Sequence, residues 1–298
     1  MSKCLVTGGA GFIGSHIVSK LLENNHHVVV LDNESSEANE AFNWYDDAEN
    51  HVVDIRDFDA CRPLFEGVEY VFHLAAYSRI QIAMERPVQC LETNYLGTYN
   101  MLECAKQVRA RRFVNSSTSS SYGLINEPPL REDMQSDCLN HYSASKIGAE
   151  TLCKMFWRLH GLRTITLRYF NVYGPRQPLK GKYAPVIGLF EEQKKRGEPL
   201  TIVGDGEQRR DFTHVYDVVE ANMCAMMTHF AGIDVNIGTG KNHSVNEVAS
   251  FISDDTINIP ERPGEAKTTL ADNRRAQRML GWTPKITLEQ YFDPNIRL

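Results

Sequence analysis

The first half of the chain alternates short apolar runs with longer segments whose apolar residues recur at helical spacing. The short runs predict strands at Cys4–Thr7, Val28–Leu31, Val68–Leu74, Arg112–Ser117 and Thr164–Tyr169. The longer segments predict helices at Phe12–Leu22, Val88–Val108 and Tyr142–His160. Strands that alternate with helices in this way are typical of a doubly wound α/β fold, in which helices cover both faces of a parallel sheet.

Turn residues become frequent after Tyr169, which predicts loops that shape a substrate site. A later helical segment, Val215–Thr228, is followed by a strand-like run, Asp234–Ile237, that is long enough to return to the main sheet. We therefore expect a first domain over residues 1–170, to which residues 210–240 return. Residues 171–298 would form mainly a smaller, non-contiguous C-terminal α/β domain that binds the substrate.

The composition narrows the class of protein. A charged fraction of 23% and a hydrophobic fraction of 42% are typical of a globular protein, and no apolar run approaches the ~18 residues of a membrane span. A net charge of −6 provides no broad basic field for nucleic acid or anionic lipid. We expect neither partner.

The seven cysteines are odd in number and include no CxxC pair, which suits reduced thiols and gives no metal-ligand spacing. The strand-like run that begins at Lys3 leaves no room for a secretion signal. These features predict a cytoplasmic protein without a bound metal.

A glycine pattern lies between the first predicted strand and the first predicted helix. The segment Thr7-Gly8-Gly9-Ala10-Gly11-Phe12-Ile13-Gly14 is a GxxGxxG motif. Glycines in this context permit a tight turn, let backbone N–H groups approach a pyrophosphate, and leave space for the helix to pack on the strand. The motif predicts a Rossmann-type dinucleotide site that includes Gly8, Gly11, Phe12, Ile13 and Gly14.

An acidic residue ends the second predicted strand. Asp32 lies 24 residues after Gly8, where a carboxylate would accept hydrogen bonds from the adenosine ribose hydroxyls. Asn33 and Glu34 follow, with no adjacent Arg or Lys to accept a 2′-phosphate. The cofactor predicted from these residues is NAD rather than NADP.

A second motif, Tyr142-Ser143-Ala144-Ser145-Lys146, has i, i+4 spacing. On a helix this spacing brings a phenol and an ammonium to one face, where the cation favours the phenolate and so creates a base. The predicted strand at Arg112–Ser117 ends in hydroxyl groups, among them Thr118, at the edge where open α/β sheets bind ligands.

Together with segments farther along the chain, these motifs resemble the extended short-chain dehydrogenase/reductases, specifically nucleotide-sugar epimerases of the UDP-glucose 4-epimerase type. The segments that carry the resemblance are TGGAGFIGSH from Thr7, DIRD from Asp54, HLAA from His73, ETNYLGTYNMLE from Glu92, SSTSSSYG from Ser116, YSASK, LRYFNVYGPRQ from Leu167, GDGEQRRDFTHVYDVV from Gly204 and RPGE from Arg262.

The resemblance implies functional residues beyond the two motifs. Further residues at the cofactor would be Asp54, Ile55, Leu74, Ala75, Ala76, Asn94, Ser116, Ser117, Tyr169 and Phe170. Residues at a UDP-hexose substrate would be Ser78, Thr118, Tyr142, Asn171, Ala184, Val186, Arg210, Arg262, Glu265 and Thr269. Arginines suit the diphosphate because guanidinium matches phosphate geometry. We expect Arg209, His73 and His214 to be structural.

Three reactions are consistent with these residues. In C4 epimerisation, Tyr142 takes the proton from the sugar 4-hydroxyl, Lys146 lowers the tyrosine pKa, and Thr118 hydrogen-bonds the reacting oxygen while NAD holds the hydride. A 4,6-dehydratase or decarboxylase would share the oxidation step. However, the dehydratases typically have an Asp-Glu pair after the threonine, and this chain has Ser119 and Ser120. A non-catalytic NAD sensor is a remote alternative, because such proteins usually lose the Tyr-Lys pair.

The resemblance also bears on the sugar and on assembly. Thr269, seven places after Arg262, is expected to form the wall that faces the C2 substituent. Its small size predicts that UDP-GlcNAc and UDP-GalNAc enter, and UDP-Glc and UDP-Gal as well. Val88–Val108 and Tyr142–His160 would form the four-helix bundle of a homodimer.

Overall fold

A parallel sheet of seven strands forms the centre of the computed structural model, which describes residues 1–36, 39, 41–179, 184–261 and 266–296. The strands are β1 (Lys3–Thr7), β2 (His27–Asp32), β3 (Glu49–Val52), β4 (Tyr70–His73), β5 (Arg112–Thr118), β6 (Thr164–Tyr169) and β11 (Ile233–Ile237). Their order is β11-β6-β5-β4-β1-β2-β3, so the direction of winding reverses between β1 and β4. The predicted doubly wound fold is confirmed.

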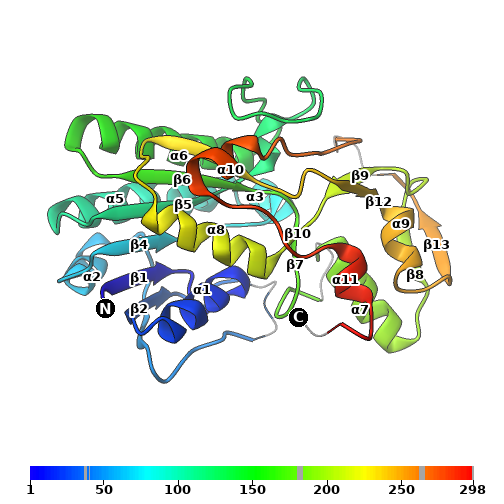
Figure 1. Cartoon of the computed structure of the whole chain (residues 1–298), viewed down its shortest axis with the longest axis horizontal. Coiled ribbons are helices and arrows are strands. Elements are labelled where there is room, and N and C mark those ends of the chain that lie inside the picture. The colour runs from blue at the N-terminus through cyan, green and yellow to red at the C-terminus, as the bar shows by residue number, and fades with distance from the viewer. Residues whose placement is uncertain (37–38, 40, 180–183, 262–265, 297–298) are drawn as a thin grey trace.

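Helices cover both faces of the sheet (Figure 1). They are α1 (Phe12–Glu23), α2 (Phe58–Cys61), α3 (Ile80–Glu85), α4 (Pro87–Leu91), α5 (Thr98–Gln107), α6 (His141–His160), α8 (Val215–Met227) and α10 (Arg274–Leu280). Shorter helical turns are η1 (Arg62–Phe65), the π-helical η2 (Glu92–Gly97) and η3 (Ser119–Tyr122).

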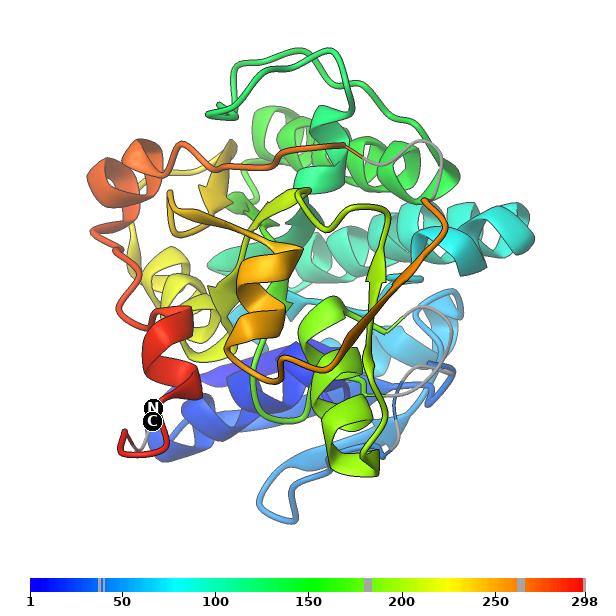
Figure 2. The same ribbon diagram turned by 90° about the vertical axis from the view of Figure 1, so that its right-hand side faces the viewer.

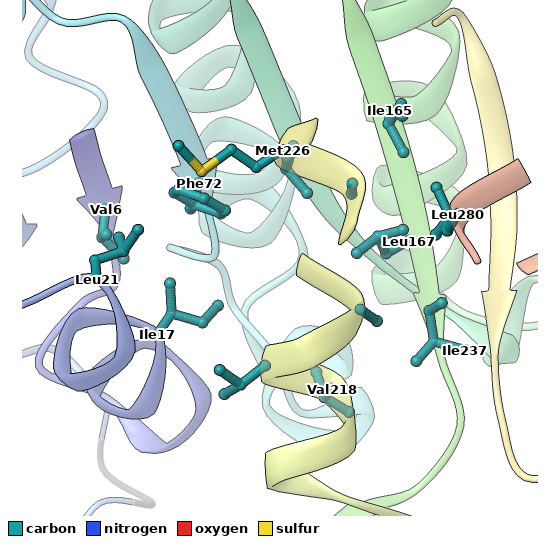
Figure 3. Packing of buried hydrophobic residues seen from close by; sticks show 14 of the residues in the cluster. Val6, Ile17, Leu21, Phe72, Ile165, Leu167, Val218, Met226, Ile237 and Leu280 are labelled. Carbon is teal, nitrogen blue, oxygen red and sulfur yellow. The ribbon is translucent and has the colours of Figure 1, made fainter. Parts of the chain in front are cut away.

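The buried face of each helix follows from its apolar spacing. Ile17 and Leu21 of α1 lie four residues apart and are fully buried, and they pack toward Val6 of β1 and Phe72 of β4 (Figure 3). On the same face α8 contributes Met226. The opposite face is covered by α5 and α6 in a separate apolar cluster. Burial on both faces explains the apolar middle of β1, β2 and β4.

The chain leaves the main sheet after β6 and builds a smaller lobe, which faces the viewer in Figure 2. Its elements are β7 (Val172–Tyr173), β8 (Leu200–Val203), β9 (Arg209–Asp211), β10 (Thr213–His214), β12 (Asn242–Ser244), β13 (Thr256–Ile259), α7 (Val186–Arg196), α9 (Val245–Ser250) and α11 (Leu288–Phe292). These strands pair two by two, β10 with β7, β12 with β9 and β13 with β8. Between β10 and β12 in the sequence, the chain returns to the main sheet as β11, which pairs with β6 at its edge.

Candidate active site

A cleft of ≈ 420 Å³ opens at the carboxyl ends of the main strands, where β1 and β4 diverge. This is the position at which open α/β sheets bind ligands. The cleft is lined by most of the residues predicted for the cofactor, namely Gly8, Gly11, Phe12, Ile13, Gly14, Asp32, Asn33, Ile55, Leu74, Ala75, Ala76, Ser116, Ser117, Tyr142, Lys146 and Tyr169. Asp54, Asn94 and Phe170 do not line it.

The glycine motif makes a cradle that has no room for side chains. Gly8 has a φ of +67°, and a Cβ there would lie 2.7 Å from the amide nitrogen of Ala75. A Cβ on Gly14 would lie 2.1 Å from the carbonyl oxygen of Gly8. Gly11 precedes the first residue of α1, so the N-terminal end of this helix faces the cleft. The cradle fits the pyrophosphate of NAD, because backbone N–H groups and the helix dipole both favour an anion there.

Asp32, which is predicted to bind the ribose of NAD, ends β2 and lines the cleft. Its Oδ2 accepts a hydrogen bond from the N–H of Ala10 at 3.1 Å, and its Oδ1 accepts from the N–H of Glu34 at 2.9 Å. Burial raises the pKa of this carboxyl, and the backbone hydrogen bonds oppose that shift. Asp32 is thus fixed by the backbone on either side, with its carboxylate at the cleft.

The three predicted cofactor residues outside the cleft support those that line it. Asp54 accepts a hydrogen bond from Asn33 Nδ2 at 3.0 Å. Phe170 is fully buried in an apolar cluster with Tyr122. Asn94 lies in the π-helical turn η2 and is described below. The contacts observed for these three residues are with the protein, and their place at the cofactor stays a prediction.

The Tyr142-Lys146 motif begins helix α6, and both side chains line the cleft. The side chain of Asn140 caps the helix by accepting a hydrogen bond from the N–H of Ser143 at 2.8 Å. Lys146 is buried, and its Nζ donates to the carbonyl oxygen of Ser116 at 2.9 Å. Burial lowers the pKa of Lys146 to about 8, so this lysine still carries its proton near neutral pH.

Tyr142 has a pKa that is raised by burial. Two groups oppose this shift: a hydrogen bond with Thr118, and the positive charge of Arg79. The sequence predicts that Lys146 lowers this pKa, but the ammonium is held by the Ser116 carbonyl and does not act on the phenol here. Thr118 and Arg79 therefore favour the phenolate.

Asn94 ties the loop after β4 to helix α6. Its Oδ1 accepts from the N–H of Tyr77 at 2.7 Å, and its Nδ2 donates to the carbonyl of Tyr77 at 3.0 Å and to Ser145 Oγ at 2.9 Å. Asn94 is buried, so these bonds are protected from water. They fix residues 77–79 relative to Tyr142. π-Helical turns are often found at functional sites.

A second cavity of ≈ 320 Å³ adjoins the cleft on the side of the smaller lobe. Among the residues predicted for the substrate, it is lined by Asn171, Ala184, Val186 and Arg210, while Ser78, Thr118 and Tyr142 line the first cleft. The two cavities share Arg79, Asn171, Val172 and Pro185. The cofactor site and the predicted substrate site are therefore continuous.

Of the other residues predicted at the substrate, Thr269 lines neither cavity. Arg262 and Glu265 lie outside the described residues. Thr269 is held by Asp211 and Arg209: its Oγ1 accepts from the N–H of Asp211 at 3.4 Å, and its own N–H donates to the carbonyl of Arg209 at 3.0 Å. No contact described here places Thr269 against the sugar.

The residues expected to be structural are bonded within the protein. Arg209 forms an ion pair with Glu247 at 3.0 Å. His73 is buried between Thr7 and Thr98, and burial lowers its pKa to about 3, so it is neutral. His214 Nδ1 accepts from the N–H of Tyr216 at 3.2 Å, and burial lowers its pKa to about 4.

The prediction missed one charged residue of the site, Arg79. It lies directly before α3 and next to Ser78, so it borders the HLAA segment, but it belongs to none of the motifs. The sequence could have pointed to Arg79 only as a basic residue shortly after the predicted strand that ends at Leu74. The fold brings Arg79 to the cleft that Tyr142 lines, where its charge acts on the phenol.

The glycine cradle, the ribose carboxylate and the Tyr-X-X-X-Lys pair on one cleft define a dinucleotide-dependent enzyme of the short-chain dehydrogenase/reductase class. A family model described as GDP-mannose 4,6 dehydratase matches residues 5–293. The chain belongs to this extended short-chain dehydrogenase/reductase family, and the predicted cofactor, NAD, is bound in solved structures of similar proteins.

Similar proteins act on UDP-sugars. A putative UDP-glucose 4-epimerase of Methanocaldococcus jannaschii is 40% identical over 294 residues, which cover 96% of this chain and 94% of that protein. A UDP-glucose 4-epimerase of Thermotoga maritima, solved with UDP-glucose, has a TM-score of 0.92 and 36% identity and covers 97% and 96% of the two chains. A UDP-glucuronic acid 4-epimerase of Bacillus cereus, solved with UDP-glucuronic acid and NAD, has a TM-score of 0.89 and 29% identity and covers 98% and 96%.

Among the described residues, no cluster of His, Cys, Asp and Glu side chains could hold a metal ion. In the part of the chain that the structure describes, no helix is both long and apolar enough to cross a membrane.

Proposed function

We propose that this protein is an NAD-dependent isomerase that epimerises a UDP-hexose at C4 through a transient 4-keto sugar. The observation that supports this most strongly is the position of Tyr142 and Thr118. Both line the cofactor cleft, which is continuous with the cavity that holds Asn171 and Arg210. A sugar whose nucleotide lies in the second cavity would reach this pair.

Different residues of the chain would bind the cofactor, move the proton and stabilise the phenolate. The glycine cradle and Asp32 would hold NAD, which supplies a hydride acceptor and donor at the sugar's C4. Tyr142 removes the proton of the 4-hydroxyl and returns it. Thr118 hydrogen-bonds the phenol and so makes its phenolate easier to form. Lys146 lines the cleft and is held by the Ser116 carbonyl, and its ammonium would donate hydrogen bonds to the nicotinamide ribose hydroxyls.

A 4,6-dehydratase needs an acid and a base at positions where this chain has serines. Dehydration at C5 and C6 requires an acid and a base in addition to the tyrosine. The two residues after Thr118 are Ser119 and Ser120, which line the cleft with hydroxyls that are neither acids nor bases near neutral pH. Epimerisation requires only that the 4-keto sugar turns over before hydride returns, and so it fits the groups present.

Assembly and location form part of the proposal. Large apolar side chains are exposed along α4, η2 and α5, namely Val88, Leu91, Tyr95, Leu96 and Tyr99. Such a face favours a partner helix, and a homodimer through these helices and α6 would cover it. All seven cysteines are free thiols, which suits the cytoplasm.

The proposed function does not specify which substituents the substrate sugar carries at C2 and C6. At C2, we predict that the pocket accepts UDP-GlcNAc and UDP-GalNAc as well as UDP-Glc and UDP-Gal, because Thr269 is small. The test compares kcat/KM for acetylated and plain substrates between the wild type and Thr269→Tyr. An unaltered ratio would remove Thr269 as the wall.

Product analysis by NMR tests the proposed function. The protein is incubated with NAD and a UDP-hexose, with Tyr142→Phe as the inactive control. A C4 epimer from the wild type alone supports the proposal. A 4-keto-6-deoxy sugar, a decarboxylated pentose, or no product from any UDP-sugar would contradict it.

A further inference from the structure

One guanidinium lies at the border of the two cavities without an anionic partner. Arg79 is among the few residues that line both cavities. Its Nε is buried and has no hydrogen-bond partner, and the group whose charge acts on it is Tyr142. In the described part of the chain, no carboxylate comes within ion-pair distance of this guanidinium.

Two buried arginines of this protein donate hydrogen bonds to protein acceptors, although the Nε of Arg112, like that of Arg79, is buried without a partner. Arg168 forms an ion pair with Glu150 at 2.6 Å. Arg112 donates to the backbone carbonyls of Phe230 and Thr228. Arg79 is half-buried, and its desolvation without a partner is costly and lowers its pKa. A bound anion would remove this cost.

The backbone holds Arg79 in place for such a ligand. Asn94 fixes both the N–H and the carbonyl of Tyr77, two residues before Arg79, and helix α3 begins at the next residue. The backbone of Arg79 is therefore fixed on both sides, and the cleft that its side chain lines also contains the hydroxyls of Thr118 and Ser119. Preorganised groups of this kind bind a small anion with little loss of entropy.

The two arginines of the site occupy different parts of it. Arg210 lines the second cavity only, on the side where the nucleotide diphosphate is expected. Arg79 also lines the first cleft, where its charge acts on Tyr142, the base that removes the proton from the oxygen on C4. An anion that meets Arg79 therefore belongs to the sugar, near C4.

We propose that Arg79 binds the C6 carboxylate of a UDP-hexuronic acid, so that this enzyme prefers an acidic UDP-sugar to a neutral one. A guanidinium matches a carboxylate with paired, charge-assisted hydrogen bonds. The carboxylate of a hexuronic acid is attached to C5, the neighbour of C4, whereas the C2 substituent lies across the ring. The inference rests on the proposed function and leaves the C2 substituent open.

The first test compares kcat/KM for UDP-glucuronic acid and UDP-glucose. The wild type should prefer the acid by about tenfold or more, and Arg79→Gln should reduce the acid-to-neutral ratio by about 10- to 100-fold, as expected for a lost hydrogen bond to a charged group. Arg79→Lys, which keeps the charge and loses the paired geometry, should lie between the two.

Binding of UDP alone separates this role from a role at the diphosphate. UDP carries the diphosphate without the sugar, so its affinity for Arg79→Gln should stay at the wild-type value. If Arg79→Gln weakens UDP and both UDP-sugars equally, Arg79 serves the diphosphate and the inference is wrong. Retained NAD and an unchanged melting temperature verify that the variant is folded.

A binding experiment keeps the inference distinct from the proposed function. Calorimetry with Tyr142→Phe measures the affinity for both UDP-sugars without turnover. Tighter binding of UDP-glucuronic acid supports the inference even if no epimer forms with the wild type. Equal affinities, together with equal kcat/KM values in the wild type, would overturn the inference and leave C4 epimerisation standing.

Discussion

Tyr142 is the residue on which the chemistry depends, and its environment explains its use as a base. Burial raises its pKa, while Thr118 and Arg79 lower it. The motif itself was visible in the sequence. The groups that set the pKa were not, because Thr118 comes from β5 and Arg79 from the segment before α3, and only the fold brings them to α6.

Removing the Thr118 hydroxyl should shift the pH dependence of the rate. In Thr118→Val the phenol loses a hydrogen bond that favours its ionised form, so the pKa of Tyr142 rises and a smaller fraction is active at neutral pH. The acidic limb of kcat/KM should move to higher pH, and the rate near pH 7 should fall about 3- to 10-fold. Thr151→Val, on the exposed side of α6, is the control. An unshifted profile would exclude Thr118 from this role.

Asp32 should determine the choice of cofactor. Asp32→Asn removes a negative charge that would accept hydrogen bonds from ribose hydroxyls and repel a 2′-phosphate. NAD affinity should fall by about tenfold, and the preference for NAD over NADP should narrow. Titration of both cofactors measures this, with Asp46→Asn at an exposed position as the control. Identical curves for Asp32→Asn and the wild type would remove Asp32 from the site.

The elements show what a single sequence can reveal. All six strands predicted for the main sheet are present, because apolar runs that are buried on both faces leave a clear pattern. Strand β3 was missed because it is an edge strand with exposed Glu49, Asn50 and Val52. The helix predicted over Val88–Val108 is α4, η2 and α5 in succession, since a π-helical turn at Asn94 leaves no trace in apolar periodicity.

A buried ion pair holds α6 against the main sheet. Arg168 of β6 pairs with Glu150 of α6, and Glu150 also accepts a hydrogen bond from Ser117 at 2.6 Å. Burial raises the pKa of Glu150, and Arg168 opposes that shift. This contact positions the helix that carries Tyr142 and Lys146.

Arg168→Met should therefore be strongly destabilising, because it leaves Glu150 buried without its cation. The free energy of unfolding should fall by about 3–5 kcal/mol, measured by urea denaturation. Arg111→Met, whose ion pair with Glu69 is exposed, is the control and should change it by less than about 1 kcal/mol. A small effect at Arg168 would mean that water reaches Glu150.

For the whole molecule, the exposed apolar face of α4, η2 and α5 leads to the prediction of a homodimer. Sedimentation at micromolar concentration should give a dimer for the wild type. Leu96→Glu, at a position that is 53% exposed on η2, should give a monomer. Ile257→Glu, 52% exposed on the smaller lobe, should stay dimeric. A monomeric wild type would refute the dimer and leave the chemistry untouched.

The central claim is that C4 is oxidised and then reduced again on the same sugar. The most direct measurement uses a UDP-hexose with deuterium at C4 and follows the label by NMR. The account predicts a C4 epimer that keeps the deuterium at C4, with no label in solvent, because the hydride leaves and returns within one closed site. Deuterium at C6 of a 4-keto-6-deoxy product, or an epimer that has exchanged its label with solvent, would contradict it.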